Sequence, residues 1–252
     1  IERVLVPLVE TADVFVAAGI PKERVFVSGL CIEPALAERA EAAYGKRLER
    51  LAGAEPLCGA YFSSGAEPRR HVEMITTAAL STVSQGDRAI LFARRAGRLA
   101  EAVKRTFDEV RQGLDIVVDP LDIPARMHDA ALCLYDDRRE LNEFTARLFD
   151  RFDYYVAPSH ERTCWALGLG LPTFIVEPPI GSFAPLNRDY LLEQQVARSV
   201  SDMEVAARFG PELRRARESG GLTAMAQACW GRYEIRGFDN IAGLLRVGGS
   251  EH

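Results

Sequence analysis

Several features that mark whole classes of protein are missing from this sequence. The five cysteines are widely spaced and none belongs to a CxxC pair, which argues against a disulfide framework and against a zinc site of the usual spacing. No apolar run approaches the roughly 18 residues of a membrane-spanning helix. Basic residues are not in excess, since 31 Lys and Arg face 36 Asp and Glu. We therefore expect no nucleic-acid partner, no bound metal and a cytoplasmic location.

What the chain does contain is a large apolar fraction arranged in short blocks. Hydrophobic residues make up 48% of the 252 residues, enough for one large domain or two small ones. Continuous apolar runs at 57–63, 87–93, 153–159 and 172–179 alternate with segments of helical periodicity. Continuous rather than alternating apolar runs are typical of parallel strands buried on both faces. The pattern predicts an α/β fold with a Rossmann-like parallel sheet and helices on both faces.

The first loop of interest follows the strand expected at 57–63. Ligands of such sheets bind beyond the carboxyl ends of the strands, and here Ser63, Ser64 and Gly65 are small enough for an anion to approach the backbone. A helix expected from Arg69 would add its positive end, and Arg69 in its first turn is a further candidate for binding. The same residues are equally consistent with a plain strand-to-helix turn.

A second polar loop follows the strand at 153–159. It contains Ser159, His160, Glu161 and Thr163, all capable of hydrogen bonding at the start of a short helix. Ser159 alone could be a helix cap. The cap leaves His160 and Glu161 unexplained, and these could bind a ribose or sugar hydroxyl.

A third loop leaves the strand at 172–179 and contains several prolines, which fix its conformation. Rigid loops at this edge are more often functional than not. Glu177 at the strand exit is a candidate acid, base or hydroxyl acceptor. The other candidates for this cleft are Gly181, Ser182, Asn187 and Arg188. We identify no catalytic residue among these loops.

Three stretches together resemble a known family. The three stretches are "PKERVFVSGLCIEPAL", "AYFSSGAEP" and "YVAPSHERTCWALGLGLPTFIVEPPIGSFAPLNRDYLLEQQVA". They are similar to the carboxyl-terminal, donor-binding half of GT-B glycosyltransferases, with the MurG-like and diacylglycerol-glycosyltransferase-like groups nearest. The resemblance covers roughly residues 20 to 245. It implies a donor domain at 21–252, preceded at 1–20 by a linker or the end of another domain.

The resemblance also implies a function and a set of partners. A nucleotide-sugar, with UDP as the expected nucleotide, would bind Ser64 and Gly65 through a phosphate and the 159–163 loop through the nucleoside, while 180–188 would face the sugar. No cofactor is implied, and the sugar would be transferred to an acceptor. An amino-terminal domain outside this sequence could associate with a membrane surface.

Two departures from the family pattern keep other functions open. Trp165 stands where the family has its ribose-binding glutamate, and Phe183-Ala184-Pro185-Leu186 stands where it has a D-Q or Q-Q pair. A non-catalytic relative acting as a binding module would tolerate both changes. A sugar-nucleotide epimerase of the same fold would instead need a histidine and carboxylates in one cleft, and His160, Glu161 and Glu177 could supply them.

Overall fold

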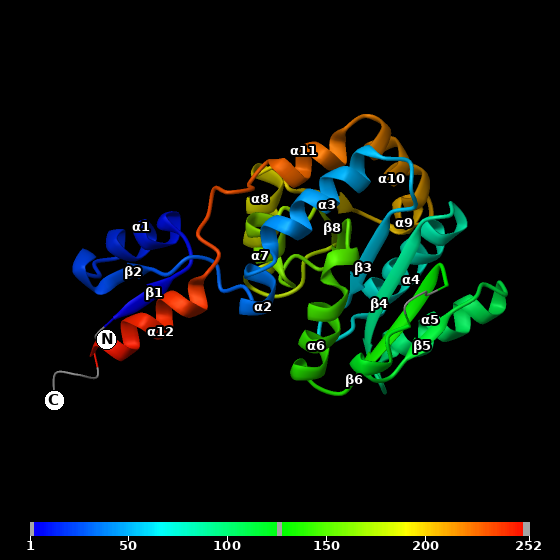
Figure 1. The fold of residues 1–252 in the computed structure, drawn as a ribbon, viewed down its shortest axis with the longest axis horizontal. Coiled ribbons are helices and arrows are strands. Elements are labelled where there is room, and N and C mark those ends of the chain that lie inside the picture. Colours follow the sequence, from blue (N-terminus) through cyan, green and yellow to red (C-terminus); the bar gives the residue numbers. More distant parts are fainter. Residues whose placement is uncertain (1–2, 125–127, 249–252) are drawn as a thin grey trace.

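The structure, a computed structural model, describes residues 3–124 and 128–248. Its centre is a seven-stranded sheet in the order β5-β6-β4-β3-β7-β8-β9, with every neighbouring pair parallel (Figure 1). The strands are β3 (Cys58–Phe62), β4 (Arg88–Arg94), β5 (Asp115–Val117), β6 (Ala130–Tyr135), β7 (Tyr154–Ala157), β8 (Thr173–Val176) and β9 (Ala197–Val200).

Helices cover both faces of this sheet, and each face has its own apolar core. One core lies under α4 (Arg69–Ser84), α5 (Arg98–Glu109), α9 (Met203–Ala207), α10 (Phe209–Glu218) and α11 (Gly221–Gln227). The other lies under α2 (Pro34–Ala37), α6 (Arg138–Leu148), α7 (Thr163–Gly168) and α8 (Ala184–Glu193). Helix α3 (Ala40–Ala52) contributes Leu51 to the first core and Ala43 to the second. The continuous apolar strands follow from this burial on both faces.

A small second unit lies to one side of the seven-stranded sheet (Figure 1). Strands β1 (Val4–Val6) and β2 (Val25–Val27) pair in parallel, joined by α1 (Val9–Ala17) and the short 3-10 turn η1 (Lys22–Arg24). Helix α12 (Gly237–Gly248) lies beside them, and the Arg3 guanidinium donates to the Leu244 carbonyl oxygen at 3.3 Å.

Two chain segments join this unit to the large sheet. They run side by side, because the Leu30 amide donates to the Glu234 carbonyl at 2.7 Å and the Gly237 amide donates to the Leu30 carbonyl at 3.0 Å. We call residues 28–33 and 229–237 the crossing segments. The division of the chain at residues 20 and 21 stays a prediction, and residues 1–2 lie outside the described part.

The predicted α/β class with a Rossmann-like parallel sheet is confirmed. The segment between β2 and β3 forms two helices, α2 and α3, and the terminal helix α12 was not predicted. The remaining 3-10 turns are η2 (Pro120–Asp122) and η3 (Phe149–Arg151). Among the described residues, no helix has the length and apolar character needed to cross a membrane.

Candidate functional site at the carboxyl edge of the sheet

The strand order places the expected crevice between β3 and β7. The chain proceeds from β3 to β4, β5 and β6 on one side, then returns to β7 on the other side of β3. The exit loops of β3 and β7 therefore diverge at this point. Such a switch point is where open parallel sheets bind ligands.

The β3 exit loop, residues 63–68, is a tight turn that leaves several polar groups available. The Glu67 amide donates to the Ser64 carbonyl at 3.0 Å. The Glu67 carboxylate is buried and accepts a hydrogen bond from the Leu99 amide at 3.3 Å, so it caps the start of α5. The Ser63 hydroxyl is buried and has no partner in the described residues. No side chain caps the start of α4.

A small pocket lies directly against this loop. It has a volume of about 90 Å³ and is lined by Ser63, Arg94, Arg138 and Glu161 beside the backbone of Gly65. Its other polar walls are Tyr135, Asp136 and Asp137. The Arg138 guanidinium lies 3.6 Å from the Glu161 carboxylate. A methyl group added at Gly65 would lie 3.6 Å from the Arg94 guanidinium, which shows how near this cation is to the turn. The pocket thus joins the exits of β3, β4, β6 and β7.

The β7 exit loop, residues 158–162, is arranged differently from the helix cap considered for Ser159. The Ser159 hydroxyl donates to the Ala184 carbonyl at 2.6 Å and so ties the loop to the start of α8. The residue that precedes α7 is Arg162, with left-handed backbone geometry (φ 53°). His160 is exposed, and Thr163 is the first residue of the helix.

A second polar group lies at the exit of β8. Glu177 accepts a hydrogen bond from the Ser199 hydroxyl at 2.9 Å and lies 3.7 Å from the Arg188 guanidinium. Arg188 also pairs with Asp189 at 2.7 Å. The His71 Nε2–H donates to the Pro178 carbonyl at 2.9 Å and joins the first turn of α4 to this loop.

His71 is the most buried polar side chain of this second group. Removal from water lowers its pKa, although the hydrogen bond to Pro178 acts in the opposite direction. Its Nδ1 atom is buried without a partner in the described residues. The neutral form, with the proton on Nε2, fits this environment.

The candidate residues therefore fall into two groups and some separate positions. Ser63, Gly65 and Glu161 meet in the small pocket, and Glu177 pairs with Arg188. Arg69 is exposed and pairs with Glu73, while Gly181 and Ser182 are exposed in the loop before α8. Of the remaining candidates, Ser64 is buried in the turn, Asn187 lies within α8, and Ser159, His160 and Thr163 occupy the positions described above.

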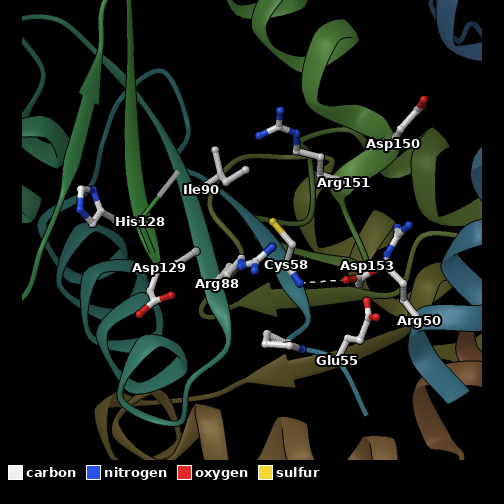
Figure 2. Close-up of a pocket in the computed structure, with 12 residues that line it drawn as sticks. Arg50, Glu55, Cys58, Arg88, Ile90, His128, Asp129, Asp150, Arg151 and Asp153 are labelled. Atoms are coloured by element: carbon white, nitrogen blue, oxygen red, sulfur yellow. Dashed lines mark hydrogen bonds and ion pairs between the residues drawn. The ribbon is translucent and has the colours of Figure 1, made fainter. Parts of the chain in front are cut away.

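A larger cavity lies at the opposite edge, where the strands begin (Figure 2). Its volume is about 650 Å³, and Arg50, Arg88, Arg151 and Cys58 are among its walls. The fully buried Asp153 carboxylate holds one wall together, because it accepts from Arg50 Nε at 2.6 Å and from the Cys58 amide at 2.8 Å. Helix amino termini, which favour anions, point to the other edge, so size alone does not make this cavity the site.

The site residues predicted from the sequence did not include Arg94, Arg138, His71 and Arg162. Arg94 is the last residue of β4 and Arg138 the first of α6, so reading every strand exit would have found both. No local signal marks Arg162 as buried. Within residues 3–124 and 128–248, no group of three or more His, Cys, Asp or Glu side chains could hold a metal ion.

Comparison with solved structures places this architecture among known folds. The UDP-GlcNAc 2-epimerase from Neisseria meningitidis bound to UDP-GlcNAc superposes with a TM-score of 0.64 at 11% identity, over 97% of this chain and 62% of that one. S. aureus MnaA with UDP gives 0.54 at 10% identity, over 98% and 58%. Arabidopsis thaliana UGT89C1 with UDP gives 0.51 at 13% identity, over 97% and 58%. The chain has a GT-B-type fold.

These likenesses concern the fold alone, because the identities are low. The chain spans about three fifths of the length of these proteins. No family model and no curated protein sequence matches it. The GT-B fold implied by the resemblance is thus confirmed, whereas the glycosyltransferase donor-domain assignment, with its MurG-like and diacylglycerol-glycosyltransferase-like groups, stays a prediction.

Proposed function

We propose that the carboxyl edge of the seven-stranded sheet binds a nucleotide-sugar, with a phosphate in the pocket formed by Ser63, Gly65, Arg94, Arg138 and Glu161. One observation carries the proposal. The unpartnered Ser63 hydroxyl lies in a pocket that Arg94 and Arg138 also line, at the switch point and beside the start of α4, where Pro68 provides no side-chain cap. Hydroxyl, guanidinium and helix amino terminus are the donors that bind phosphate.

UDP is the expected nucleotide and transfer of the sugar to an acceptor is the expected reaction. The solved structures named above that bind UDP or UDP-GlcNAc support the nucleotide class. The rest of the ligand would lie over the β7 and β8 exit loops, where His160, Glu177 and Ser182 are candidates for contacts. A cytoplasmic location and association with a membrane surface through a further domain remain part of the proposal.

Epimerisation is the second candidate, favoured by the fold of the N. meningitidis enzyme. The carboxylates considered for this reaction have different neighbours: Glu161 lies beside Arg138, whereas Glu177 lies beside Ser199 and Arg188. Only a ligand that spans both groups would use both acids. A non-catalytic binding module is favoured by Trp165, which is fully buried at the position of the family's glutamate.

The first test is a comparison of two arginines at opposite ends of one strand. Arg94 ends β4 at the proposed site, and Arg88 begins β4 at the large cavity (Figure 2). Both are exposed. Calorimetric titration with UDP, GDP, ADP, CMP and their sugars should give one binding nucleotide. Arg94→Met should then weaken binding at least about tenfold, as expected for a lost charged hydrogen bond. Arg88→Met should leave the affinity unchanged.

The opposite pattern would move the site to the amino edge of the sheet. Absence of binding by any nucleotide would overturn the proposal itself. Once a nucleotide-sugar binds, product analysis without an acceptor separates the activities. An epimerase changes the sugar alone, whereas a transferase leaves the donor intact or hydrolyses it slowly. A binding module changes neither the donor nor any acceptor offered.

A further inference from the structure

Arg162 is an unusual residue for a polar loop at the edge of a sheet. Its side chain is only 2% exposed, although it directly follows His160 and Glu161 at the carboxyl edge. Charged side chains are almost never this buried unless they have partners. Its φ of 53° is left-handed, a conformation that is strained for a residue other than glycine. Something in the fold holds this conformation.

The guanidinium group of Arg162 contacts three other parts of the chain. It lies 3.3 Å from the Glu33 carboxylate and donates to the Asn142 side-chain oxygen at 3.4 Å. It also lies over two aromatic rings, 5.1 Å from the Phe62 centroid and 4.3 Å from the Trp165 centroid. Cation–π contacts of this kind are strongest when they are shielded from water. One side chain therefore links the β7 exit loop to α6, to β3 and to the residue before α2.

The backbone of Arg162 is fixed as well. The Tyr155 hydroxyl donates to the Arg162 carbonyl at 3.0 Å, and the Trp165 amide donates to the same carbonyl at 2.9 Å. The Glu161 amide donates to the Pro158 carbonyl at 2.9 Å. These hydrogen bonds hold the loop on both sides of the Glu161 side chain, whose carboxylate lies 3.6 Å from the Arg138 guanidinium at the small pocket.

Glu33, the partner of Arg162, lies where the small unit joins the large sheet. It is the last residue of the first crossing segment, which joins the small unit to the large sheet, and it directly precedes α2. The ion pair with Arg162 therefore ties the β7 exit loop to the place where the chain enters the seven-stranded unit. A displacement of the first crossing segment would therefore move or break this ion pair and change the conformation of the β7 exit loop.

We propose that Arg162 is a positioning residue of the carboxyl-edge site, which holds the β7 exit loop in its binding conformation through Glu33 and the rings of Phe62 and Trp165. The inference rests on the proposed nucleotide site. It assigns a role to an arginine that does not itself touch the ligand. A purely structural arginine would stabilise the whole protein without any particular effect on this loop.

The test compares Arg162→Met and Glu33→Gln with Arg39→Met. Arg39 is a matched control, because it also joins the α2 region to α6, through the Ala35 and Ala146 carbonyls, but it does not contact the β7 exit loop. Nucleotide affinity is measured by calorimetry with UDP. Loop order is measured by hydrogen exchange at the Glu161 and Trp165 amides in the free protein.

Both loop variants should expose these two amides to faster exchange than in the wild type, with no change at residues 63–71. If the binding conformation of the loop falls to a fifth of the population or less, the UDP dissociation constant rises at least about fivefold. Arg162→Lys keeps the charge without the planar stack and should give an intermediate loss. Arg39→Met should lower the melting temperature without changing either readout.

Two results would overturn the inference. Unchanged exchange at Glu161 and Trp165 in Arg162→Met would show that the arginine does not order the loop. Faster exchange across the whole chain, equal to that in Arg39→Met, would show a structural role only. Failure of the wild type to bind any nucleotide is a different outcome, because it overturns the proposed site and leaves the exchange measurements to decide whether Arg162 orders the loop.

Discussion

Replacement of Trp165 separates a packing role from a ligand-binding role at a position where the resemblance to GT-B glycosyltransferases implies a glutamate. Trp165 is fully buried among Phe62, Phe149 and Tyr155, with ring centroids at 5.9, 5.3 and 6.1 Å. The Arg162 guanidinium lies over it from the loop side. On this geometry the indole supports the floor of the loop and does not face a ligand. Trp165→Phe keeps an aromatic ring beneath Arg162, so it should change stability and leave nucleotide affinity nearly unchanged.

The size of the effect depends on what replaces the indole. Trp165→Ala should lower the free energy of unfolding by about 3–5 kcal/mol, the usual cost of removing a buried aromatic ring. Trp165→Phe keeps a six-membered ring and removes an indole N–H that has no hydrogen-bond partner among the described residues. Removing an unsatisfied buried donor returns about 1–3 kcal/mol, so the net loss should be no more than about 2 kcal/mol.

Thermal unfolding and fluorescence measure this prediction. For a chain of this size about 1 kcal/mol corresponds to a shift of about 2–4 °C in Tm, so the phenylalanine variant should melt within roughly 8 °C of the wild type. The chain has 2 tryptophans, so all tryptophan fluorescence of Trp165→Phe comes from the less buried Trp230. A loss of nucleotide affinity at unchanged stability would refute the reasoning, because it would place the indole against the ligand.

Four further substitutions test the packing and the charges. Gly210→Ala would bring a methyl group against the Ser81 carbonyl and should cost at least about 1 kcal/mol in urea unfolding, whereas Gly45→Ala meets open space in α3 and should add about 0.5–1 kcal/mol. Burial lowers the pKa of His71 below its ordinary value of 6.5, so stability is lost as the pH falls below 6.5, where the unfolded chain binds a proton more readily. Between pH 7 and 5 the Tm of His71→Gln should therefore fall less than that of the wild type. Arg47→Met should lose about 3 kcal/mol or more by the same urea assay, because the fully buried guanidinium donates to three backbone carbonyls.

The sheet was predictable because its strands are encoded locally. The apolar runs at 57–63 and 87–93 coincide with β3 and β4 to within about one residue, since a parallel strand covered on both faces has to be apolar throughout. Helix α12 was missed for the opposite reason. It includes Gly237 and Gly243, which are weak helix formers, and its support comes from packing beside the distant β1–β2 pair.

The candidate site was only partly predictable, because it depends on strand order. The loops after β3 and β7 contain recognisable turn residues, and the sequence correctly indicated that polar groups gather there. Which of those groups meet depends on the sheet order, which no local pattern specifies. Arg162 shows the limit most clearly. Its partner Glu33 is 129 positions away, so its burial follows from the fold and not from its neighbours in sequence.

The size of the carboxyl-edge pocket restricts what this chain contributes to binding. Its volume of about 90 Å³ is far below the roughly 300–1,000 Å³ of sites that enclose a small-molecule ligand, but it is comparable to a phosphate group with its nearest water. This pocket would therefore enclose a phosphate group of a nucleotide-sugar, and the remainder of the ligand would lie over the β7 and β8 exit loops. Affinity in this arrangement depends mainly on charge and should fall steeply with added salt. The ratio between the Arg94 and Arg88 variants, measured at one ionic strength, is for that reason more informative than any single dissociation constant.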